Sequence, residues 1–133
     1  MKNYVNFQPN PSWNGKGRYN HEDCSIRAVC AATGKTWEEV YDLLMETGKE
    51  VFDAQTSDQS VERALYKLGF QRCSVRVEKG SKRPTPSSLT RENPDKALVM
   101  RVSGHFVGGR NGLYMDCWDC GKKGIYTYYQ KAV

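Results

Sequence analysis

The chain has 133 residues, a formal net charge of +5, and 38% hydrophobic and 11% aromatic residues. This length and composition predict one globular domain, residues 1–133, and exclude a disordered chain. No apolar run approaches the roughly 20 residues that a membrane span needs, so we expect no membrane association. The first residues lack the apolar stretch and cleavage site of a secretory signal, which favours a cytoplasmic location.

The cysteine count and the positive charge bear on the redox state of the thiols and on the kind of partner. Five cysteines are an odd number, and without a secretory signal free thiols are a better expectation than disulfides. The basic residues are scattered apart from one cluster, "VEKGSKR". A nucleic-acid groove usually shows denser clusters with interleaved aromatic residues, so the charge favours an ordinary solvated surface.

The first half of the chain predicts an irregular arm followed by three helices. Residues 1–19 are rich in Asn, Pro, Gly and Ser and show no period, which indicates an irregular N-terminal arm. Apolar spacing predicts a helix over 23–32, which Gly34 ends. Thr36 and Glu39 form a capping box that starts a second helix, which we expect Gly48 to stop. A third helix is predicted over 58–68.

The second half predicts strands. "FQRCSVRVE" alternates like a strand, and a loop over 79–96 follows, with a short helical turn after Pro86. The runs "ALVMRVSGHFVGG" and "LYMDCW" flank an Asn-Gly turn, which predicts a hairpin, and "GIYTYYQKAV" gives a last strand. Helices followed by an antiparallel sheet indicate an α+β fold.

The stretch "NHEDCSIRAVCAATG" raises the question of chemistry, because Cys24 lies at the first turn of a predicted helix. The partial positive charge of a helix N-terminus lowers the pKa of a thiol and favours the reactive thiolate. Asp23 is placed to cap this helix, although its negative charge opposes thiolate formation. A nucleophile of this kind also needs a base and a group that orients the base.

Hairpin register supplies both partners. If Asn111 and Gly112 form a two-residue turn, His105 and Asp116 fall on the same face as diagonal neighbours, near enough for a carboxylate to reach an imidazole. Asp119 points to the opposite face, so the register selects Asp116. A bulge at Gly108 and Gly109 would change this count.

The segments "NHEDCSIRAVCAATGKTWEEVYDLL" and "GHFVGGRNGLYMDCWD" resemble the small papain-like cysteine peptidases, in the compact form common in phage and bacterial genomes and close to the C39-like peptidases. The resemblance covers most of the chain from about residue 20. It implies a papain-like fold with Cys24 as nucleophile, His105 as general base and then acid, and Asp116 as orienting group. A phage-encoded protein would act in the host cytoplasm.

The resemblance also implies an oxyanion-binding side chain, usually Gln, a few residues before the nucleophile. Here the nearest amide is Asn20, and Arg18 is a second donor at a more typical distance. The backbone N–H of Cys24 is available in either case.

We therefore expect a monomeric thiol hydrolase, a peptidase or amidase, that forms a thioester intermediate and uses no metal or organic cofactor. Its substrate would be a protein or peptide, and the positive charge hints at an acidic one. Cys117 and Cys120 form a C-x-x-C pair, but a zinc site would need a second pair. The alternatives are a deamidase or transglutaminase-like acyl transferase, an inactive papain-fold binding protein, or a small basic nucleic-acid-binding protein.

Overall fold

The computed structural model of the protein describes residues 2–16, 19 and 21–133. Helices in this part of the chain are α1 (Cys24–Thr33), α2 (Trp37–Val51), α3 (Asp58–Lys67) and α4 (Pro86–Glu92). Its strands are β1 (Tyr4–Asn6), β2 (Gln71–Ser74), β3 (Lys96–Val102), β4 (His105–Arg110), β5 (Leu113–Asp116) and β6 (Thr127–Ala132). None of the described helices combines the length and the apolar character that crossing a bilayer requires.

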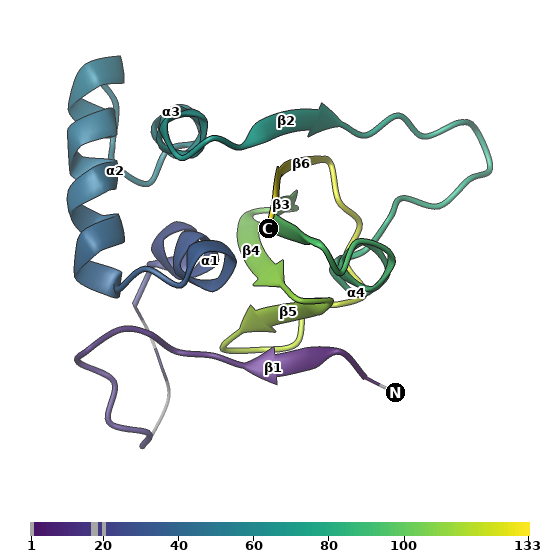
Figure 1. The fold of residues 1–133 in the computed structure, drawn as a ribbon, viewed down its shortest axis with the longest axis horizontal. Coiled ribbons are helices and arrows are strands. Elements are labelled where there is room, and N and C mark those ends of the chain that lie inside the picture. Colours follow the sequence, from purple (N-terminus) through teal and green to yellow (C-terminus); the bar gives the residue numbers. More distant parts are fainter. Residues whose placement is uncertain (1, 17–18, 20) are drawn as a thin grey trace.

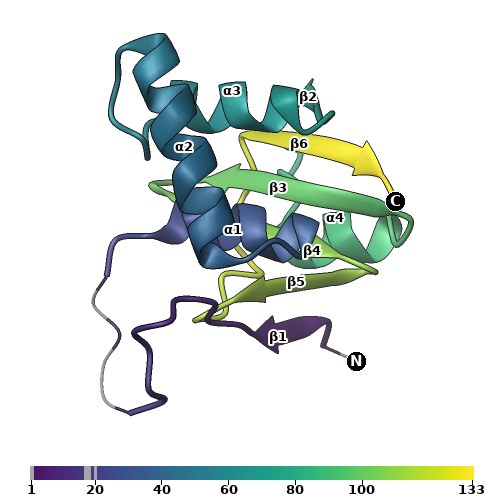
Figure 2. The same cartoon turned by 60° about the vertical axis from the view of Figure 1, so that its left-hand side comes forward.

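The strands form one mixed sheet in the order β1-β5-β4-β3-β6-β2. Helices α1 to α3 cover one face of this sheet and α4 lies against the other (Figures 1 and 2). The predicted α+β class is confirmed. The sheet is not purely antiparallel, because β1 pairs in parallel with β5.

The helix boundaries follow local signals with one exception. Gly34 ends α1 in the left-handed conformation, and Thr36 forms the predicted capping box with Glu39 at the start of α2. The prediction that Gly48 stops α2 is wrong, since this helix continues to Val51. A Cβ at Gly48 would lie 3.0 Å from the Asp53 carbonyl oxygen, so glycine there serves the close approach of the following loop.

The strand predictions are partly wrong. Part of the expected irregular arm, Tyr4–Asn6, is strand β1. The run "ALVMRVSGHFVGG" forms two strands, because a tight turn with Gly104 at a φ of 64° separates β3 from β4. The Asn-Gly hairpin has the predicted register, with Arg110 opposite Leu113 and no bulge at the two glycines.

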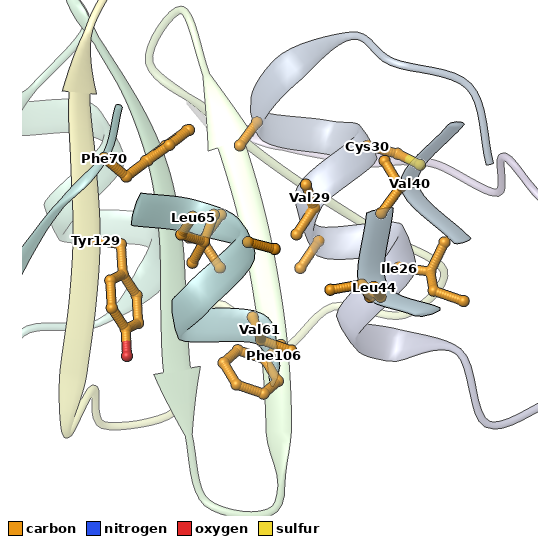
Figure 3. Packing of buried hydrophobic residues seen from close by; sticks show 14 of the residues in the cluster. Ile26, Val29, Cys30, Val40, Leu44, Val61, Leu65, Phe70, Phe106 and Tyr129 are labelled. Carbon is orange, nitrogen blue, oxygen red and sulfur yellow. The ribbon is translucent and has the colours of Figure 1, made fainter. Parts of the chain in front are cut away.

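Two hydrophobic layers enclose the sheet. Side chains of α1, α2 and α3 pack on one face against Val99, Phe106 and Tyr129 (Figure 3). On the other face, Leu98 and Met100 pack with Leu89 of α4. Because both faces are covered, β3 is apolar at successive positions instead of alternating.

Gly108 sets the distance between α1 and β4. A Cβ at this position would lie 1.9 Å from the carbonyl oxygen of Ala28, so the backbones of the helix and the strand are in direct contact. Since Cys24 is at one end of α1 and His105 begins β4, this contact also fixes how the two residues meet.

We predict that Gly108→Ala destabilises the fold by about 1–3 kcal/mol, because overpacking forces the two backbones apart. Urea denaturation gives the free energy of unfolding. Gly124→Ala is the matched control, since the atoms nearest to its Cβ belong to the side chain of Arg83, at 3.1 Å and beyond, and not to a packed backbone. Equal stability of the two variants would contradict the role of Gly108 as a spacer.

Candidate active site

Cys24 is the first residue of α1, and its side chain is partly accessible. Asp23 occupies the N-cap position but makes no side-chain hydrogen bond to the N–H groups of the first turn. Such groups attract negative charge at a helix N-terminus. The helix therefore keeps donors beside the sulfur that a capping side chain would normally occupy.

His105 and Asp116 meet as the hairpin register predicted. The His105 Nε2 atom lies 2.6 Å from Asp116 Oδ2, and both residues are buried. The Asp116 Oδ1 atom accepts hydrogen bonds from the backbone N–H of Cys117 at 2.8 Å and from Arg27 Nε at 2.7 Å. Because Nε2 is engaged by the carboxylate, Nδ1 is the ring nitrogen left to serve a nucleophile.

The environment of Cys24 favours its thiolate. Burial by itself raises the pKa of this thiol, but a hydrogen bond with His105, a backbone hydrogen bond at Phe106 and the positive charges nearby bring the pKa below its ordinary value. For His105, burial disfavours the charged ring, yet hydrogen bonds with Asp116, Cys120 and Cys24 raise its pKa to about 11. The two shifts favour the same state, a Cys24 thiolate beside a His105 imidazolium.

Arg27 joins the helix N-terminus to the histidine's partner. This arginine is 4% exposed, and its guanidinium donates to Asp23 and to Asp116, each at 2.7 Å. The pairing explains why Asp23 does not suppress the thiolate, since its charge is neutralised by Arg27. Asp23 also accepts hydrogen bonds from Tyr19, Asn10 and the Trp37 indole.

The cysteine and histidine open into a hollow of about 450 Å³. Trp118 forms part of its wall and covers the imidazole, with ring centroids 4.9 Å apart. His21, Thr56 and Gly104 complete much of the rim. The nucleophile and the edge of the imidazole are therefore reachable from outside, while the Asp116 carboxylate is shielded from solvent.

Sequence reasoning missed two neighbours of this site. Cys120 is buried and donates from Sγ to Asp116 Oδ2 at 3.5 Å, and burial raises its pKa, so it remains a thiol. Arg27 gave one usable signal, its spacing of four residues from Asp23. The oxyanion candidates Arg18 and Asn20 lie outside the described residues.

Three ligand atoms, from His105, Asp116 and Cys120, lie within 4.8 Å of one another. Hydrogen bonds already link these groups, and the Arg27 guanidinium touches the carboxylate. A cation there would face that positive charge. The cluster is better suited to holding a proton than to holding a metal.

Comparison of the chain with models of protein families, with curated proteins and with solved structures found no match.

We predict that iodoacetamide alkylates Cys24 first and does so well below pH 8. The lowered pKa keeps Cys24 a thiolate as the pH falls, until the pH passes through that lowered value. Burial raises the pKa of Cys30 to about 12 and also raises the pKa of Cys117 and Cys120, so these thiols are protonated at neutral pH. Mass spectrometry of the alkylated peptides across a pH series measures the order in which the cysteines react.

In His105→Ala, the pKa of Cys24 should rise and its advantage should disappear. The control Cys30→Ala removes a core thiol and leaves the imidazole in place. Slow alkylation of Cys24 in the wild type, with the pH profile of an ordinary thiol, would contradict the ion pair.

We predict that Arg27→Met destabilises the fold by about 3–5 kcal/mol, because it leaves two buried carboxylates without their shared cation. Methionine keeps much of the side-chain volume, so the change reports mainly on charge. Arg63→Met is the control, since its ion pair with Glu50 is exposed to solvent and such pairs contribute little to stability. Urea denaturation gives the free energy of unfolding of both variants. A similar loss of stability in the two would contradict the central role of Arg27.

Proposed function

We propose that the protein is a cysteine-dependent hydrolase that cleaves peptide or amide bonds with Cys24, His105 and Asp116. The observation that supports this most is the order of neighbouring groups from carboxylate to imidazole to thiol. Asp116 holds His105 at 2.6 Å, and His105 lines the same hollow as Cys24 and lowers the pKa of its thiol. Nucleophile, base and orienting group in this order are the requirements of covalent acyl transfer.

The reaction would begin with attack of the Cys24 thiolate on the substrate carbonyl carbon. The carbonyl oxygen then carries the negative charge, which the N–H groups at the start of α1 can stabilise. The His105 imidazolium donates its proton to the leaving amine, the C–N bond breaks, and a thioester forms. Water, deprotonated by His105, attacks the thioester, and the thiolate and the carboxylic acid are released.

Asp116 has a positioning role in this scheme. Its carboxylate fixes the tautomer and the direction of the imidazole and stabilises the imidazolium. The bonds from Arg27 and from the Cys117 N–H hold the carboxylate itself in place. The same machinery would serve a deamidase or an acyl transferase, because these differ only in the group that leaves or the group that accepts the acyl chain.

We expect the protein to form an acetyl-thioester on Cys24 when it is mixed with p-nitrophenyl acetate. The activated thiolate attacks the ester, and release of p-nitrophenolate gives a burst. Intact-mass analysis should show one added acetyl group in the wild type and none in Cys24→Ala. Asp116→Asn should slow acylation by about 10²–10⁴-fold, because the imidazole then lacks its anionic partner.

Asp119→Asn is the matched control. Asp119 bonds with Tyr114, Lys2 and the Gly121 N–H and makes no contact with His105 that would orient the ring. Acetylation spread over several cysteines, or equal rates in the two asparagine variants, would contradict the proposed function.

A further inference from the structure

A second hollow, of about 690 Å³, adjoins the one that holds Cys24. The two hollows share His21, Glu22 and Thr56 in their linings. Asp23, the residue directly before the nucleophile, also lines the second one. A molecule whose reacting carbonyl lies at Cys24 can therefore extend into the second hollow.

The two hollows differ in chemical character. The second is lined mostly by apolar surface, whereas polar groups are as prominent as apolar ones around Cys24. Trp37 and Tyr41 form one wall as a stacked aromatic pair, with centroids 5.1 Å apart and planes 20° apart. Ile26 of α1 also lines it. A flat aromatic wall beside an aliphatic side chain suits a large apolar side chain.

This wall is fixed to the catalytic network. The Trp37 indole donates to Asp23 at 2.9 Å, and Asp23 is held by Arg27, which in turn holds Asp116. The position of the aromatic wall relative to the nucleophile is thus set by one partly buried and two buried hydrogen bonds. A subsite at a fixed distance from the reacting sulfur selects one residue of an extended substrate.

We propose that this second hollow is a substrate subsite that takes a large apolar or aromatic side chain of a peptide. This inference rests on the proposed function. A peptide is the occupant that fits, because its polar backbone can lie against the Cys24 hollow while one side chain enters the apolar one. Glu22, an exposed carboxylate on the shared rim, disfavours an acidic side chain at that position.

The test uses two series of acetyl-dipeptidyl chloromethyl ketones, which alkylate a cysteine at a peptide-like position. In one series the varied residue adjoins the electrophile, and in the other it lies one residue further away. The varied residue is Phe, Leu, Ala or Asp, and alkylation of Cys24 is followed by mass spectrometry. Only the series that places the varied residue in the second hollow should discriminate. In that series we expect the Phe and Leu probes to react about ten- to a hundredfold faster than the Ala probe, and the Asp probe to react more slowly than the Ala probe.

Two variants alter the hollow in opposite ways. Tyr41→Ala removes part of the wall, and Gln55→Trp fills the space from the loop between α2 and α3. Both should reduce the ratio of the Phe rate to the Ala rate to within about twofold of unity. This ratio compares two probes on one protein, so a change in thiol reactivity cancels. Tyr66→Ala, an exposed aromatic residue of α3 outside the lining, is the matched control and should keep the ratio.

The inference is overturned if neither series prefers Phe over Ala, or if the preference survives in both hollow variants. Iodoacetamide reactivity separates these outcomes from failure of the proposed function, because a small reagent does not need the subsite. Cys24→Ala gives a readout that needs no thiol chemistry: acetyl-Phe-Gly-amide, and not acetyl-Ala-Gly-amide, should shift the indole N–H resonance of Trp37 in nuclear magnetic resonance spectra. Absence of that shift would also overturn the inference.

Discussion

The rest of the site depends on the ion pairs that the buried guanidinium of Arg27 makes with two carboxylates. It bridges Asp23, at the start of α1, and Asp116, at the end of β5. A buried cation between two buried carboxylates is costly to disrupt, because each lost contact leaves a charge without its partner. Arg27 therefore ties the helix to the hairpin through charge, while Gly108 allows the two backbones to touch.

This bridge also balances the charges around the thiol. Arg27 neutralises one of the two carboxylates, and the remaining negative charge stabilises a protonated His105 next to Cys24. Because Asp23 is held by Arg27 and three neighbouring side chains, it does not cap α1. The helix N-terminus then keeps its N–H groups for the thiolate and for an oxyanion.

The fold could be predicted where local physics decides it. The capping box at Thr36, the left-handed Gly34 and the Asn-Gly turn each satisfy their backbone requirements within a few residues. Prediction failed where an element depends on residues that lie outside it. Strand β1 exists because β5 offers it a hydrogen-bonding edge, and α2 passes through Gly48 because a later loop packs there.

The sequence by itself determined that Cys24 begins a helix and that His105 and Asp116 share one face of a hairpin, since helix caps and strand register are short-range properties. Only the tertiary structure decided that this helix end meets this hairpin, that Arg27 links them, and that Trp37 forms a wall beside the nucleophile. The contacts between the helix and the hairpin join segments 80 or more residues apart. The contact of Trp37 is with the Asp23 carboxylate, whose partners no local pattern specifies. Charge neutralisation and close packing select them, and both depend on the complete fold.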